Sequence, residues 1–150
     1  MDLKSADQIL DFAIQKEEEA AELYHDLATT LDRPDMKQVF ESFAREEMQH
    51  KAKLIDVKNG NRIISSEKKI FDLKIGDSLV DVKPTPNMDY QHVLIFAMKT
   101  EKAAYKLYND LAQATDDPSL KELFLGLAQE EAKHKLRFEI EYDDQILTEN

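Results

Sequence analysis

The chain has 150 residues, a formal net charge of −11, three glycines, four prolines and no cysteine. This length suits one domain with a single core, the scarcity of turn residues favours long helices, and the lack of cysteine excludes disulfides and thiolate-bound metals. The negative charge argues against a nucleic-acid partner, and a chain without a long apolar run or a signal-peptide segment is expected to be cytoplasmic, with no membrane contact.

A first helix is predicted over residues 5–31. Ser5 and Gln8 have the spacing of a capping box at its start. Apolar side chains then recur at helical spacing along one face, and Glu17 interrupts them. A carboxylate on a face that packs into the core is costly unless it is protonated, paired or bound to a metal.

A second helix is predicted over residues 34–59, with Pro34 as its first residue and Gly60 as its stop. Its apolar face contains Glu47 and His50, which are three residues apart and therefore lie one above the other. Such spacing arises by chance in any Glu-rich helix. The pair is informative because it interrupts an apolar face.

Residues 61–88 show no sustained helical period and contain Gly76, Pro84 and Pro86. A stretch of this length without regular structure needs an explanation inside a compact domain. A long crossover that runs the length of a helix bundle is the favoured interpretation. A small second domain is the alternative, although the stretch has too few apolar residues for a core of its own.

A third helix is predicted over residues 89–115, with Asn87 or Asp89 as its cap. Its apolar face is interrupted by Glu101. The position of this carboxylate matches that of the buried-face carboxylate in the first helix.

A fourth helix is predicted over residues 118–142, followed by a frayed polar tail over residues 145–150. Its apolar face is interrupted by Glu131 and His134, again three residues apart. This helix therefore repeats the Glu-x-x-His pair of the second helix.

The two halves of the chain are copies of one another. From Ile9 to Leu54, 19 of 46 residues are identical to the residue 84 positions later. This is a duplicated helical hairpin. Two hairpins joined by one long crossover make an antiparallel four-helix bundle, so the predicted fold is all-α, in one domain over residues 1–150.

Six ionisable side chains on the four apolar faces form a ligand set. One Glu from each of two helices and a Glu-x-x-His pair from each of the other two is the pattern of two-metal carboxylate bundles. Two divalent cations would neutralise the four carboxylates with both histidines uncharged, and these faces contain no Lys or Arg that could do so. The predicted metal ligands are Glu17, Glu47, His50, Glu101, Glu131 and His134.

The ligand types narrow the choice of metal. Mixed carboxylate and imidazole ligation suits iron or manganese, whereas zinc more often takes a smaller four-coordinate shell. Two Fe ions are the expected cofactor, with Mn as the alternative.

Tyr24 and Tyr108 are candidate catalytic residues. Each lies two helical turns after the Glu ligand of its own helix, and therefore on the same face. They are interpreted either as core residues with a hydrogen-bonded hydroxyl or as hydroxyl donors or radical quenchers near the metals. His25 and His92 fit no such pattern and are interpreted as surface residues.

Four motifs at matched spacing span both hairpins: Glu17-x-x-Ala20-x-x-x-Tyr24, Glu46-Glu47-x-x-His50, Glu101-x-x-Ala104-x-x-x-Tyr108 and Glu130-Glu131-x-x-His134. They resemble the ferritin-like superfamily, and most closely the rubrerythrin di-iron domain. The resemblance implies a ferritin-like four-helix bundle with a non-haem di-iron centre. It implies Glu47 and Glu131 as bridging ligands, Glu17 and Glu101 as terminal ligands, and a homodimer.

The sequence departs from rubrerythrins in two respects. Rubrerythrins typically carry a rubredoxin-like domain with four Cys that feeds electrons to the iron. The lack of Cys here therefore implies a separate electron donor, such as a rubredoxin-like protein. Rubrerythrins also have a further Glu three residues after the third-helix ligand, where this chain has Ala104. The remaining six ligands are similar to those of bacterioferritin, whose site is a ferroxidase.

The leading functional hypothesis is a rubrerythrin-like oxidoreductase that reduces hydrogen peroxide or dioxygen as Fe(II) is oxidised. The first alternative is a ferroxidase or another protein of iron storage and handling. The second is a structural or binding module in which the metal only stabilises the bundle. Manganese catalase-like or oxygenase chemistry is a further alternative.

Overall fold

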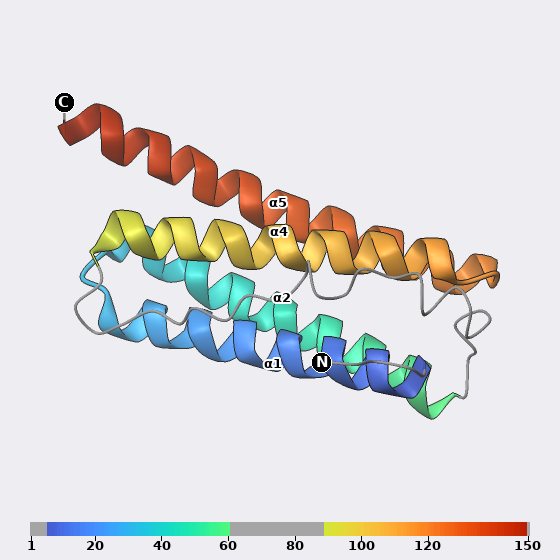
Figure 1. Cartoon of the computed structure of the whole chain (residues 1–150). Coiled ribbons are helices and arrows are strands. Elements are labelled where there is room, and N and C mark those ends of the chain that lie inside the picture. Colours follow the sequence, from blue (N-terminus) through green and yellow to red (C-terminus); the bar gives the residue numbers. More distant parts are fainter. Residues whose placement is uncertain (1–5, 61–88, 150) are drawn as a thin grey trace. The chain divides into compact units, whose positions relative to one another are not determined.

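The computed structural model describes residues 6–60 and 89–149, with the backbone alone for residue 6 and residues 146–149. These residues form four α-helices: α1 (Ala6–Thr30), α2 (Pro34–Asn59), α4 (Tyr90–Ala114) and α5 (Pro118–Glu149) (Figure 1). The described ranges contain no strand, so the prediction of an all-α chain with four helices is confirmed. The predicted crossover over 61–88 and the predicted cap at Ser5 lie outside the described residues.

The first two helices form an antiparallel hairpin (Figure 1). Pro34 occupies the first turn of α2, where a missing backbone N–H costs nothing. Gly60 ends α2 as predicted, and its N–H donates to the carbonyl of Asp56 at 2.9 Å. Lys58 Nζ lies 2.5 Å from Asp11 Oδ1 and joins the end of α2 to the start of α1.

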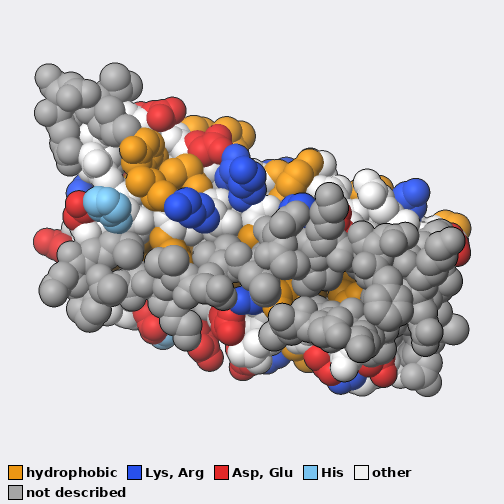
Figure 2. Space-filling view, viewed as in Figure 1, with side chains coloured by type: hydrophobic (Ala, Val, Ile, Leu, Met, Phe, Trp, Pro, Cys, Tyr) orange, Lys and Arg blue, Asp and Glu red, His pale blue; other side chains and the backbone are white. Residues whose placement is uncertain are grey.

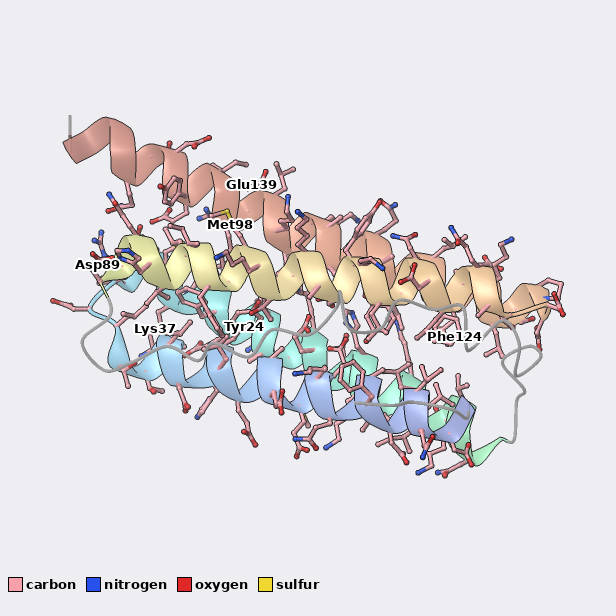
Figure 3. All side chains as sticks on the ribbon, viewed as in Figure 1. Tyr24, Lys37, Asp89, Met98, Phe124 and Glu139 are labelled. Carbon is pink, nitrogen blue, oxygen red and sulfur yellow. The ribbon has the colours of Figure 1, made fainter. Side chains whose placement is uncertain are left out.

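The last two helices form a second antiparallel hairpin (Figure 1). Asp89 caps α4 as predicted, because its side chain accepts a hydrogen bond from the N–H of His92. Asp117 does the same for α5: its Oδ1 accepts from the N–H groups of Ser119 at 2.8 Å and Leu120 at 3.3 Å. Asp89 is labelled at the start of α4 in Figure 3.

The apolar faces predicted from the sequence are buried in both hairpins. Large side chains from all four helices have almost no exposed surface. Those with at most 1% exposure include Leu10, Phe40 and Leu54 in the first hairpin and Leu94, Leu111, Phe124 and Phe138 in the second.

The helix α5 is longer than predicted. It continues to Glu149, whereas the sequence predicted an end near Tyr142 and a frayed tail from Gln145. No Gly or Pro follows Tyr142 to stop the helix, and the remaining residues have ordinary helix propensity.

The two hairpins are separate compact units, α1 with α2 and α4 with α5. A single domain over residues 1–150 stays a prediction. No helix in the described ranges is both long and apolar enough to cross a membrane.

Candidate metal centre

The α1–α2 hairpin buries three ionisable side chains at one level. Glu47 and His50 lie one turn apart on the buried face of α2, and α1 brings Glu17 beside them. Their exposed fractions are 2% or less. The Nδ1 atom of His50 lies 3.5 Å from Oε2 of Glu17 and 3.7 Å from Oε1 of Glu47. The imidazole therefore lies beside carboxylates from both helices.

The α4–α5 hairpin repeats this arrangement. Glu101 lies on α4, and Glu131 and His134 lie one turn apart on α5, all with exposed fractions of 3% or less. The Nδ1 atom of His134 lies 3.6 Å from Oε1 of Glu101. In both hairpins the same ring nitrogen faces the carboxylate of the neighbouring helix, so the duplicated sequence gives a duplicated geometry.

The spacing within each hairpin fits a metal ion. The two carboxylates and the imidazole of a hairpin offer ligand atoms that all lie within 4.8 Å of one another. Two atoms bound to one ion at about 2.1 Å are about 3.0 to 3.5 Å apart, so small movements would bring these atoms into one coordination shell. Oxygen and imidazole donors suit iron or manganese. Each hairpin is therefore able to hold a metal ion.

The charge of the buried groups also favours a cation. Each hairpin buries two glutamates at this level, and no Lys or Arg side chain is buried among the described residues. A buried carboxylate carries a desolvation cost of several kcal/mol. One divalent cation per hairpin would balance the two carboxylates beside it.

Tyr24 and Tyr108 are both buried, with exposed fractions of 0% and 1%. The ring of Tyr24 (labelled in Figure 3) stacks on Phe40 at 6.2 Å between centroids and meets Phe43 edge-on at 6.1 Å. The residue that corresponds to Phe43 in the second hairpin is Leu127, so this aromatic cluster is not duplicated. These contacts explain the burial of Tyr24 as core packing. The catalytic role of the two tyrosines stays a prediction.

Glu141 is a buried carboxylate that the sequence pattern does not predict. Glu141 has an exposed fraction of 5%; its Oε1 accepts a hydrogen bond from the hydroxyl of Tyr90 at 2.9 Å, and its Oε2 lies 3.6 Å from Nη1 of Arg137. The corresponding residue of the first hairpin is Val57, so the duplication gave no signal. Its burial could have been inferred from its position seven residues, or two helical turns, after His134, which places it on the same face of α5.

His25 and His92 lie at the surface, as predicted. The ring of His92 is 67% exposed, and its Nδ1 lies 2.6 Å from Oδ1 of Asp89. The Nδ1 contact of His92 therefore belongs to the cap of α4 and not to a buried cluster.

A family model for the ferritin-like domain matches residues 5–139, a range that covers α1, α2, α4 and most of α5, with all six predicted ligands. The chain belongs to the ferritin-like domain family. The predicted ferritin-like four-helix class is thereby confirmed, whereas the rubrerythrin type stays a prediction. No match was found among curated proteins or among solved structures.

Proposed function

We propose that this ferritin-like protein is a non-haem di-iron oxidoreductase of the rubrerythrin type, which reduces hydrogen peroxide or dioxygen as Fe(II) is oxidised. The proposal rests on a duplicated group of side chains, which we call a half-site: each hairpin gathers two buried carboxylates and one imidazole. Reduction of a peroxide to water needs two electrons. Two equivalent half-sites provide for two iron ions that give one electron each.

The proposed ligand roles rest on the resemblance to rubrerythrin. Glu47 and Glu131 would hold the ions together with Glu17 and Glu101, each through its side-chain carboxylate. The two histidines would bind through Nδ1, the nitrogen that lies nearest to the cross-helix carboxylate in each hairpin. Four carboxylates would balance two divalent cations and would help to hold the higher charge after oxidation.

The chain's own residues set the conditions for this chemistry. When bound, two Fe(II) ions supply the two electrons that cleave the O–O bond of hydrogen peroxide, with uptake of two protons and release of two waters. The ligand residues are at most 3% exposed, which keeps bulk water and large oxidants away from their side chains and favours small oxidants. Tyr24 and Tyr108 are proposed as hydroxyl donors near the ligands.

Anaerobic loading with Fe(II), followed by stopped-flow mixing with hydrogen peroxide or with dioxygen, tests the proposal. We expect two Fe(II) per chain to be oxidised by one hydrogen peroxide. The variant H50A/H134A should lose this oxidation, whereas the matched surface variant H25A/H92A should keep it. Ferrous iron that is unchanged after mixing with either oxidant would overturn the proposal.

A ferroxidase or iron-storage role is the second candidate. Ala104 favours it, because this residue stands where rubrerythrins have a further carboxylate and leaves the six-ligand set that resembles bacterioferritin. Iron per chain separates the two roles. About two retained ions after oxidation support the peroxidase, and a large excess supports storage. Metal analysis of the purified protein decides between iron and manganese.

A further inference from the structure

The two hairpins differ sharply in the charge of their first helices. Residues 6–25 of α1 contain six carboxylates and one lysine. The corresponding residues 90–109 of α4 contain three lysines and one carboxylate, the buried Glu101. In a chain with a net charge of −11, α4 is the one helix of the four described that has more basic than acidic residues.

The three lysines of α4 share one side of the helix, which we call the basic face: Lys99, Lys102 and Lys106. Their spacing of three and four residues places them together, opposite the side that carries Glu101. Lys99 and Lys102 are exposed, and neither forms an ion pair with any residue in the described ranges. Lys106 lies 2.7 Å from Asp110 Oδ2. Figure 2 shows Lys and Arg side chains beside hydrophobic ones over this hairpin.

An exposed aromatic residue adjoins the basic face. Tyr105 is 38% exposed, and its counterpart in α1 is Ala21. Exposed tyrosines are common where proteins bind one another, because they combine an apolar ring with a hydrogen-bonding hydroxyl. The basic face therefore has the composition of a small interface as well as an unusual charge.

A comparison of α1 with α4 distinguishes the residues that the fold requires from those that need another explanation. The buried positions of α1 and α4 are similar because both hairpins need the same core. The outer positions are free of that need, and α1 has Gln15, Glu18 and Glu22 where α4 has its lysines. A hairpin of this type therefore folds without the lysines, and their presence needs a different explanation.

The proposed function requires an outside source of electrons. The ligand side chains are buried, so a protein donor cannot touch the iron and its electrons must cross a helix. The basic face lies across the width of α4 from Glu101, and a helix with its side chains is about 10–12 Å wide. This is a short path from the surface to the ligands of the second hairpin.

We propose that the basic face of α4 binds an acidic electron-carrier protein. The inference rests on the proposed function, because it names the partner of that same site. Two reduced one-electron carriers, binding in turn, would give one electron each and return two Fe(III) to two Fe(II), and each carrier leaves oxidised. Such redox encounters use small interfaces, and opposite charges mainly raise their association rate.

The test compares two variants with the same change of charge. K102E/K106E gives α4 the residues that α1 has at the same positions, and K37E/K53E changes two exposed lysines of α2 (Lys37 is labelled in Figure 3). Binding to the metal-free chain is measured by calorimetry at low salt, with zinc-substituted rubredoxin and with flavodoxin as acidic probes and cytochrome c as a basic probe.

We expect at least one acidic probe to bind the wild type with an affinity that falls as salt rises. K102E/K106E should weaken this binding by about tenfold or more, as expected when close charge pairs are lost. K37E/K53E should change it by less than about twofold, as is usual for charges outside an interface. Binding of cytochrome c should not weaken in K102E/K106E.

Reduction of the iron-loaded, oxidised protein gives the second readout. Reduced rubredoxin should react more slowly with K102E/K106E than with K37E/K53E, whereas dithionite should reduce all forms at one rate. Equal effects of the two variants, or no salt-dependent binding of either acidic probe to the wild type, would overturn the docking proposal. Loss of Fe(II) oxidation by peroxide would instead count against the proposed function, because that reaction needs no carrier.

Discussion

His50 Nδ1 lies 3.5 Å from Oε2 of Glu17, a carboxylate on the neighbouring helix. The corresponding pair in the second hairpin, His134 and Glu101, is separated by 3.6 Å between Nδ1 and Oε1. Each histidine thus joins the two helices of its own hairpin at a buried level. The half-sites are equivalent in geometry as well as in sequence, and removal of either should have the same effect.

We predict that H50A and H134A each weaken binding of Fe(II) by about tenfold or more at the half-site that they alter. Mutation of residues that only hydrogen-bond to metal ligands already lowers metal affinity or activity by about 10–100-fold. The other half-site should keep its own ion with less change. Anaerobic Fe(II) titration measures both sites. H25A serves as the control because His25 is exposed; the same loss in H25A would show that the effect is not specific to the ligands.

Removal of metal should destabilise the chain. An ion present at 100 times its dissociation constant stabilises the folded state by about 2.7 kcal/mol per site, which corresponds to a rise in Tm of about 5–10 °C for a chain of this size. Thermal unfolding with and without a chelator measures this shift. A Tm that is unaffected by Fe(II) and Mn(II) would contradict metal binding by the folded hairpins.

Asp89 should make the stability of α4 depend on pH. The backbone N–H of His92, and then its ring, lower the pKa of Asp89 below its ordinary value of 3.8. The charged cap therefore stabilises the fold above this value, and the contribution is lost as the pH falls through the lower pKa of the folded chain.

The D89A variant should therefore unfold at a lower temperature than wild type at pH 7, and the difference should shrink as the solution is acidified below pH 3.8. D89N is the control, because Asn is an equally good cap without a carboxyl group to titrate. Thermal unfolding at several pH values measures these effects; a constant difference between D89A and wild type would contradict the role of the charge.

The hydrogen bond from Tyr90 to Glu141 should contribute to the stability of the second hairpin. Y90F leaves a buried carboxylate without this donor, so we expect a loss of about 1.5–3 kcal/mol in the free energy of unfolding, as for hydrogen bonds to charged groups. Urea unfolding measures it. The control is Y142F, because the Tyr142 hydroxyl makes no hydrogen bond within the described ranges; comparable losses in both variants would refute the assignment.

Tyr24 should matter to stability mainly through its ring. Y24A removes a fully buried aromatic side chain and should cost about 3–5 kcal/mol, whereas Y24F keeps the contacts with Phe40 and Phe43 and should cost less than about 2 kcal/mol. F43L, which copies the second hairpin, should also be mild. If Y24F slows Fe(II) oxidation without a comparable loss of stability, the hydroxyl has a role in the reaction as well.

Several features could be predicted because they occur in both halves of the duplicated sequence. A single Glu on an apolar face, such as Glu17, has many explanations, but its match with Glu101 at a spacing of 84 residues has few. The starts of α2 and α5 followed from Pro34 and Pro118, since proline is favoured in the first turn of a helix. Burial of all six predicted ligands follows from the helical period alone.

Features that occur once were harder to predict. Glu141 has Val57 as its counterpart, and its burial depends on Tyr90, which is 51 residues away in the sequence. The end of α5 was placed too early because no local signal marks it. The basic face of α4 was also overlooked, because a net charge of −11 hides a local excess of lysine. Prediction of these three features requires either knowledge of tertiary contacts or a residue-by-residue comparison of the two hairpins.

Mössbauer spectroscopy of the protein loaded with ⁵⁷Fe(II) and then oxidised tests the central claim most directly. If the six ligands form one centre, the sample should hold two irons per chain, and their spins should couple into a diamagnetic ground state. Two uncoupled high-spin Fe(III) ions per chain would show that each hairpin binds its own metal separately. Fewer than one iron per chain would contradict the assignment of these side chains as iron ligands.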